Sequence, residues 1–273
     1  MATFLHHGQR LSYTEFGGGD RTVVLLHGLL LSQRMHHPLA EALAARGNRV
    51  ITLDLLGHGD SDRPRDMWRY SMTFFGEQTI GLLDHLGVDQ AVVMGTSLGA
   101  NTTLEAAVLA PERLRGIVVE MPVLDAAMVA CGVAFMPPLL TLRFAAPAMK
   151  VVQAGARLVP RGMLGRLGDV VLDTVRQDPE PSASVLEGLF FGRIAPHRFQ
   201  RRQIETPALV IGHPRDPVHP FSDAGMLADE LPNGRLLEAS SILELRIAPR
   251  RLTALIGDFV DECWALDPAA VAA

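Results

Sequence analysis

The chain has 273 residues, of which 48% are hydrophobic and 20% are charged, a balance typical of a globular protein with a sizeable buried core. Its net charge of −5 argues against nucleic acid as a partner, because phosphate binding needs clustered positive charge. Two cysteines, Cys131 and Cys263, are too few for a disulfide framework and suit a reducing compartment, so we expect a cytoplasmic protein.

The first 120 residues alternate between apolar, β-branched runs and stretches of helical periodicity. In chain order we expect strands at 3–7 and 11–16 joined by a Gly8-Gln9 turn, a strand at 22–26, a helix at 38–46, a strand at 49–55, a helix at 71–86, a strand at 91–94, a helix at 98–109 and a strand at 116–120. This alternation predicts a parallel sheet with helices on both faces.

The alternation pauses near residue 122 and resumes with a strand at 207–211, a helix at 223–230, a strand at 235–238 and a last helix at 249–263. Between them, residues 163–175 have helical spacing, and Ser182 is a candidate N-cap for an apolar helix around 185–191. We therefore expect a core of residues 1–122 and 204–273, with residues 123–203 inserted as a helical cap, or lid.

The motif Gly95-Thr96-Ser97-Leu98-Gly99 lies where the strand at 91–94 turns into the helix at 98–109. A serine with a glycine two residues away on either side, on a strand-to-helix turn, is the pattern of a nucleophile elbow. The turn is strained and crowded, so side chains at the glycine positions would collide with neighbouring backbone. Ser97 is therefore the candidate nucleophile.

With these residues in place, the whole chain resembles the α/β-hydrolase superfamily, in its lid-bearing esterase, lactonase and meta-cleavage-product hydrolase type. His27-Gly28, the segment Gly57-His58-Gly59-Asp60-Ser61 and Asp216 support the resemblance by their order and spacing. The resemblance implies a mostly parallel, eight-stranded sheet with the cap inserted before the strand that carries the acid. It also implies hydrolysis of a small lipophilic ester, lactone or C–C diketone.

The resemblance assigns further roles to residues of this sequence. Asp216 stands where the family places the acid that orients a catalytic imidazole, although a structural Asp-Pro turn paired with Arg215 would give the same sequence. Glu120, where some relatives carry the acid, is interpreted as structural. The backbone N–H groups of Leu29 and Leu98 are the expected oxyanion donors.

The catalytic base is missing from its usual place. No histidine follows His219, and the position at which the family carries one falls near Ile242. Three explanations stay open. In the first, another histidine substitutes: His219 is the candidate alternative base, and His213, His27 and His58 also lie near the expected sheet edge. In the second, Glu244 or a water held by Asp216 acts as the base. In the third, the protein is a weak or inactive pseudo-hydrolase that binds a small apolar ligand.

The cap sequence is rich in apolar side chains, which favours a lipophilic ligand. Those that we single out are Phe135, Met136, Leu139, Leu140, Leu142, Phe144, Met149, Met163, Leu164, Leu189, Phe190 and Phe191. The cap also has a positive bias from Arg143, Lys150, Arg157, Arg161 and Arg166. These cations could recognise a substrate carboxylate, or could simply lie on solvated helix faces.

The most apolar stretch, residues 126–142, contains Pro137-Pro138 and is short for a bilayer span, so we expect a buried or lid segment and no membrane span. We expect no metal and no cofactor. The expected partner is a small lipophilic molecule, and a homodimer is possible.

Overall fold

The computed structural model describes residues 1–266, apart from the side chains of residues 166 and 167. Its eight strands form one sheet in the order β1-β2-β4-β3-β5-β6-β7-β8. Strand β2 pairs antiparallel with both β1 and β4, and every other neighbouring pair is parallel. The predicted fold class, an eight-stranded and mostly parallel sheet with helices on both faces, is confirmed.

The strands are β1 (Ala2–His6), β2 (Gln9–Gly17), β3 (Thr22–Leu26), β4 (Arg49–Asp54), β5 (Ala91–Thr96), β6 (Leu114–Glu120), β7 (Ala208–Gly212) and β8 (Gly234–Glu238). All eight lie where the sequence predicts strands, to within two residues at each end. The first turn is one residue earlier than expected: His6 pairs with Gln9, so His7 and Gly8 make the turn, both at positive φ.

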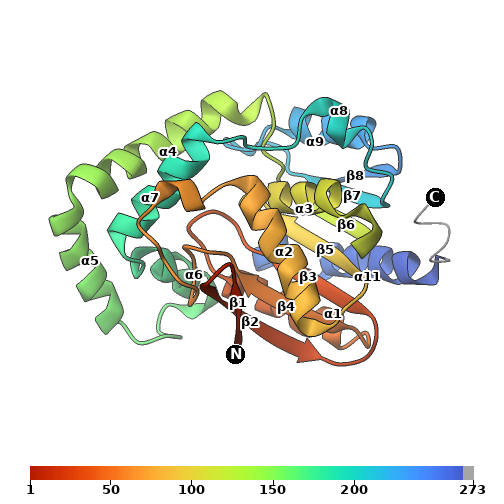
Figure 1. Ribbon diagram of the computed structural model, residues 1–273, viewed down its shortest axis with the longest axis horizontal. Coiled ribbons are helices and arrows are strands. Elements are labelled where there is room, and N and C mark those ends of the chain that lie inside the picture. Colours follow the sequence, from red (N-terminus) through yellow and green to blue (C-terminus); the bar gives the residue numbers. More distant parts are fainter. Residues whose placement is uncertain (267–273) are drawn as a thin grey trace.

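The longer helices of the core are α1 (His37–Ala44), α2 (Met72–Leu86), α3 (Leu98–Leu109), α9 (Phe221–Glu230) and α11 (Arg250–Ala265). Shorter helices of the core are η1 (Gln33–His36), η2 (Met67–Arg69), η3 (Pro111–Arg113) and α10 (Glu244–Ile247), and a further short helix, α8 (Arg198–Arg201), precedes β7. Helices α1 and α11 pack on one face of the sheet, and α2, α3 and α9 pack on the other (Figure 1).

Side chains of the central strands alternate between two apolar cores. In β5, Val92 and Met94 point toward α1 and α11, whereas Ala91 and Val93 point toward α2 and α3. Because both faces are covered, these strands are apolar along their whole length, which is why they read as continuous apolar runs in the sequence. The sheet is thereby a rigid support for the loops at its carboxyl edge.

Five helices lie between β6 and β7. Besides the short α8, they are α4 (Ala127–Phe144), α5 (Ala146–Leu158), α6 (Gly165–Val175) and α7 (Pro179–Phe191). In Figure 1 these four form a separate layer at one side of the sheet. The sequence places α6 correctly but not the start of α7, because Ser182 lies inside that helix. Asp178 is the N-cap and accepts from the Glu180 N–H at 3.2 Å, and Pro179 occupies the first helical position, which proline favours.

Helix α4 differs from its prediction in two ways. It runs through Pro137 and Pro138 without ending, and only Ala127 and Leu139 of its residues are buried. Of the two expectations, a buried or a lid segment, the first is therefore wrong, and α4 lies in the inserted segment proposed as the lid. Among the described residues it is the one helix that is long and apolar enough, by length and composition, to cross a membrane.

Candidate active site

Ser97 occupies a strained turn between β5 and α3. Its backbone has φ 54° and ψ −109°, a region that L-residues rarely adopt and that costs about 1–3 kcal/mol. A Cβ at Gly95 would overlap the Gly99 carbonyl, and one at Gly99 would overlap the Leu26 carbonyl. The two glycines therefore allow α3 to start directly against β3 and β5, which leaves the Ser97 side chain at the sheet edge.

The structure brings His219 and Asp216 to Ser97. The Ser97 Oγ and His219 Nε2 atoms are 2.9 Å apart, and His219 Nδ1 is 3.0 Å from Asp216 Oδ2. Both partners lie in the loop after β7, only three residues apart. The other oxygen of Asp216 accepts from the Val218 and His219 amides at 2.8 and 3.0 Å, which folds the loop back so that the imidazole faces Ser97.

These contacts fix the imidazole tautomer. Burial by itself would raise the pKa of Asp216, but the hydrogen bonds from the His219 ring and from the His219 and Val218 amides hold it below its ordinary value. Asp216 is therefore ionised at neutral pH and can only accept a hydrogen bond. His219 Nδ1 must donate to it, which leaves the Nε2 lone pair facing the Ser97 hydroxyl.

The loop after β3 also lies beside Ser97. A Cβ placed on Gly28 would come 3.9 Å from the Ser97 Cβ, and Leu29 and Leu98 both line the cavity around the hydroxyl. Leu98 is the first residue of α3, so its N–H has no acceptor within the helix. Gln177, between α6 and α7, donates to the Leu30 carbonyl at 2.7 Å and so fixes this loop, in which Leu30 has a φ of 58°.

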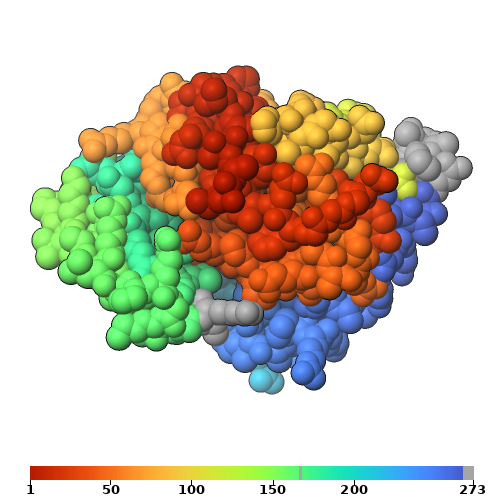
Figure 2. Space-filling model, turned by 90° about the horizontal axis from the view of Figure 1, so that it is seen from below, coloured from red at the N-terminus to blue at the C-terminus, as the bar shows by residue number. Residues whose placement is uncertain are grey.

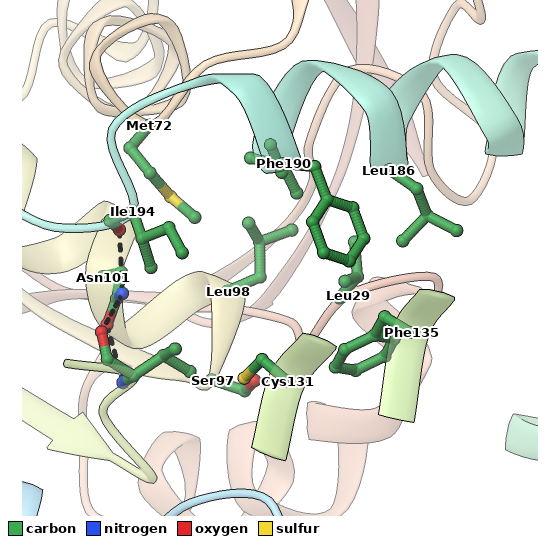
Figure 3. Close-up of a pocket in the computed structure, with 12 residues that line it drawn as sticks. Leu29, Met72, Ser97, Leu98, Asn101, Cys131, Phe135, Leu186, Phe190 and Ile194 are labelled. Carbon is green, nitrogen blue, oxygen red and sulfur yellow. Dashed lines mark hydrogen bonds between the residues drawn. The ribbon is translucent and has the colours of Figure 1, made fainter. Parts of the chain in front are cut away.

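A narrow apolar cavity of about 70 Å³ opens from Ser97 (Figure 3). Core residues contribute one side of it, and α4 and α7 contribute the other. Its lining residues are Leu29, Met72, Ser97, Leu98, Asn101, Val123, Cys131, Phe135, Leu186, Leu189, Phe190 and Ile194. None of these carries a charge at neutral pH, since burial raises the pKa of the Cys131 thiol to about 11. The cavity therefore suits a small neutral group.

The predicted apolar cap residues divide between the cavity and the surface. Phe135, Leu189 and Phe190 line the cavity. By contrast, several others are exposed to solvent: Met136, Leu140, Phe144, Met163, Leu164 and Phe191. The apolar character of the cap sequence is therefore only partly explained by a ligand at Ser97.

The loop after β8, where the family resemblance places the histidine, makes different contacts. Ile242 is 39% exposed. Arg246, on α10, binds the buried Glu120 at 2.9 Å, and Glu120 also accepts from Thr96 Oγ1 at 2.5 Å and lies 3.3 Å from His213 Nε2. Burial alone would raise the pKa of Glu120, but Arg246 and His213 hold it far below its ordinary value. Glu120 is a paired structural carboxylate.

Glu244 lies in this second loop as well and does not contact Ser97. It binds Arg251 at 2.8 Å and accepts from the Ser240 amide. The hydrogen bonds from Arg251, together with those from Ser240, lower the pKa of Glu244 to about 2. A carboxylate so acidic binds protons too weakly to act as a base near neutral pH, so the alternative of Glu244 as the base is wrong.

The remaining histidines near the sheet edge have structural partners. His27 Nε2 accepts from the Leu55 N–H at 3.0 Å, and His58 Nδ1 lies 3.0 Å from the Leu56 carbonyl. Both rings are fully buried, and burial lowers both pKa values. His213 is committed to Glu120 and to the Ser241 carbonyl. Only His219, of the four histidines considered, contacts Ser97.

Two residues that support the site are not singled out by the sequence. Asn101, one turn into α3, donates to the Val123 and Ile194 carbonyls, both at 2.8 Å, and thereby joins the two ends of the inserted helices. Asp223 of α9 accepts from the Leu124, Ala126 and Ala127 amides at 2.9–3.1 Å and so holds the start of α4. The contacts of Asn101 with Ile194 and of Asp223 with the start of α4 join residues about 90–100 positions apart, which no local pattern could reveal.

One group of side chains has the composition of a metal site. His6, His7 and Glu77 offer ligand atoms that all lie within 4.8 Å of one another. They belong to the β1–β2 hairpin and α2, and none of them lines the cavity at Ser97.

The comparison with protein families agrees with this geometry. Residues 21–159, about half of the chain, match the family described as the alpha/beta hydrolase fold. The chain belongs to the α/β-hydrolase fold family. This matched segment contains the Ser97 elbow, the loop after β3 and helices α4 and α5.

Individual relatives differ in how much of the chain they match. The 3-oxoadipate enol-lactonase 2 of Acinetobacter baylyi is 28% identical over 85% of this chain and 86% of its own length. The bifunctional epoxide hydrolase 2 of Rattus norvegicus is 34% identical, but the match spans 40% of this chain and only a fifth of that protein. The crystal structure of the enol-lactonase from Burkholderia xenovorans superposes on this chain with a TM-score of 0.78 at 22% identity. The superposition covers 95% of this chain and all of the enol-lactonase, so the two proteins share a fold.

Proposed function

We propose that this protein is a serine hydrolase that cleaves a small lipophilic ester or lactone. A C–C diketone is the alternative substrate, in which the carbon–carbon bond to the acyl group would break and the proton would go to the leaving carbon. One observation carries the proposal: Ser97 Oγ lies 2.9 Å from His219 Nε2 while His219 Nδ1 lies 3.0 Å from Asp216. Nucleophile, base and orienting acid thus have the mutual contacts that acyl transfer requires.

In the first half of the reaction, Ser97 Oγ attacks the acyl carbonyl carbon while His219 Nε2 takes the hydroxyl proton. Asp216 holds the ring and stabilises the imidazolium that forms. The carbonyl oxygen becomes an oxyanion, which the Leu29 and Leu98 amides stabilise as the proposed donors. When the tetrahedral intermediate collapses, the bond to the leaving oxygen breaks, and His219 returns its proton to that oxygen.

In the second half, water attacks the acyl group on Ser97 and gives a proton to His219 Nε2. The new tetrahedral intermediate collapses with release of the carboxylic acid, and the proton returns to Ser97 Oγ. No step needs a group that the chain lacks. The proposed steps therefore use no cofactor, and in each half of the reaction His219 acts first as the base and then as the acid.

The cavity supports a neutral substrate with a short acyl group, since its walls are uncharged and its volume is about 70 Å³. None of the cap cations whose side chains are described lines it, so a substrate carboxylate is not part of the proposal. We propose that residues 123–203 act as the lid, with α4 and α7 excluding water from the acyl group. The homologous 3-oxoadipate enol-lactonase 2 makes lactones a natural first class to test.

The proposal is tested with p-nitrophenyl esters of increasing acyl length and with simple aliphatic lactones. We expect turnover that falls as the acyl chain lengthens. Ser97→Ala should abolish it, while Ser241→Ala, a matched change at an exposed serine, should leave it unchanged. Phe190→Ala should move the preference toward longer acyl chains, because Phe190 lines the cavity. Ester turnover that survives Ser97→Ala would refute the proposal. If the wild type turned over none of the esters or lactones, the result would favour a pseudo-hydrolase that binds an apolar ligand.

A further inference from the structure

The outer face of α4 is an exposed apolar stripe. Val129, Val133, Met136, Leu140 and Phe144 repeat every three or four residues, so they share one side of the helix. Their exposed fractions are 79%, 72%, 41%, 48% and 80%. Arg143 is the only charged residue in the 18 of this helix. Contiguous apolar surface of this kind usually marks a binding surface.

The opposite face of α4 is occupied within the fold. Cys131 and Phe135 line the cavity, and Leu139 packs with Ala183 and Leu186 of α7. Asp223 holds the first turn of the helix through three backbone amides. Because one side is packed and the end is fixed, α4 can lie on an apolar partner but is not free to cross a bilayer.

Helix α5, which follows α4 directly in the chain, carries further exposed apolar residues. Val151, Val152 and Leu158 are 73%, 50% and 83% exposed, while the buried positions of α5 are Gln153 and Ala156. Figure 1 shows α4 and α5 along the outer rim of the molecule, and Figure 2 shows the green segment that contains them at one end. We call this surface the outer hairpin face: the exposed apolar residues of α4 and α5 named here and above.

The segment that carries the outer hairpin face has charges of one sign only. Residues 126–164 contain Arg143, Lys150, Arg157 and Arg161 and no aspartate or glutamate, in a chain whose net charge is −5. Arg143, Lys150 and Arg161 reach Glu187, Glu180 and Asp173 on α6 and α7, but their side chains remain 57%, 47% and 60% exposed. Ion pairs this exposed are weak, so these cations can turn toward other anions.

From these observations we propose that the outer hairpin face docks on an anionic lipid surface, with α4 and α5 lying in the headgroup region. Apolar side chains at a helix face flanked by Arg and Lys are the pattern of interfacial binding. A second copy of the chain fits less well, because two such faces in contact would bring like charges together with no carboxylate from either hairpin to neutralise them. The inner side of α4 lines the cavity, so a docked hairpin would stand between lipid and Ser97. Lipid binding requires no turnover and does not depend on the proposed hydrolysis.

The test is flotation of the full chain with phosphatidylcholine vesicles and with vesicles that also contain phosphatidylglycerol. We expect binding to the anionic vesicles that is at least several-fold stronger and that weakens with salt. Val133→Asp and Phe144→Asp should abolish it, and Arg157→Gln should weaken it about five-fold. Phe199→Asp is the matched control, because Phe199 is 65% exposed on α8, outside the outer hairpin face, and it should bind like the wild type.

Circular dichroism and thermal melts of each variant check that the exposed substitutions leave the fold intact. No flotation with anionic vesicles, or equal loss in Phe199→Asp, would overturn the proposal. Sedimentation velocity measures whether the chain is a monomer or a dimer in solution. A dimer in the wild type that Phe144→Asp dissolves would assign the outer hairpin face to a second copy and would equally overturn it.

Discussion

Two loops at the carboxyl edge of the sheet differ in what they supply to Ser97. The loop after β7 holds both Asp216 and His219, three residues apart, with the imidazole 2.9 Å from the serine oxygen. The loop after β8, where the family resemblance places the histidine, instead sends Arg246 to the buried Glu120. The resemblance locates a function by chain position, whereas the chemistry depends on which ring nitrogen reaches the hydroxyl. Here the loop after β7 carries both the proposed acid and the proposed base, and the loop after β8 stabilises the end of β6 at Glu120.

The strongest test of this difference is His219→Ala. If the loop after β7 supplies the base, turnover of a short p-nitrophenyl ester should fall about 10⁴–10⁶-fold, the range found for loss of single triad residues in a serine protease. His197→Ala changes a histidine that does not line the cavity and should leave turnover unchanged. A loss of less than tenfold in His219→Ala would move the base elsewhere.

Asp216→Asn is expected to have the next largest effect. The amide can donate to His219 Nδ1, which favours the tautomer whose Nε2 carries the proton and cannot accept from Ser97. In the serine-protease example this change costs about 10⁴ in turnover. Steady-state kinetics should show the loss in kcat with little change in KM, because no step before proton transfer uses Asp216. An equal rise in KM would indicate a collapsed loop instead.

The loop after β8 should matter for stability more than for chemistry. Arg246→Met leaves the buried Glu120 carboxylate without its guanidinium and should lower the free energy of unfolding by about 3 kcal/mol. The double variant Glu120→Gln/Arg246→Met should recover part of that loss, since no unpaired charge stays buried. Urea unfolding of both variants measures this. A larger fall in the double variant than in the single one would contradict the assignment.

The smallest expected effect is on acid stability. The pKa of Glu120 is far below its ordinary value of 4.5 in the folded chain, so the unfolded chain binds the proton more tightly. Its contribution to stability is complete above the ordinary value and is lost as the pH falls below it. Between about pH 5 and pH 3, the free energy of unfolding should therefore fall less steeply in Glu120→Gln than in the wild type. Parallel slopes would show that Glu120 is not paired as described.

The fold could be predicted well because local patterns determine it. Thr22–Leu26 is a strand of five buried apolar or β-branched residues, and Leu98–Leu109 is bounded by the elbow and by Pro111, so both elements match the predictions residue for residue. Helix α4 could not be predicted, because Pro137-Pro138 indicates a break. The carbonyl groups that the two prolines leave without a helical donor, at Val133 and Ala134, lie on a partly exposed stretch where water can bind them.

The candidate site could be predicted only in part. Ser97 and Asp216 follow from motifs within a few residues of each, and the structure brings both to His219. The choice among His219, His213, His27 and His58 depended on which ring the fold turns toward Ser97. Asn101 and Asp223 act through backbone groups of distant segments, so their importance is visible only once those segments are packed together.

The account depends most directly on the activation of Ser97 by His219. Intact-mass measurement of the rate at which a fluorophosphonate labels the protein tests this without knowledge of the substrate. We predict one adduct on the wild type, none on Ser97→Ala and labelling at least a thousandfold slower on His219→Ala. Labelling of His219→Ala at the wild-type rate, or an adduct on Ser97→Ala, would contradict it.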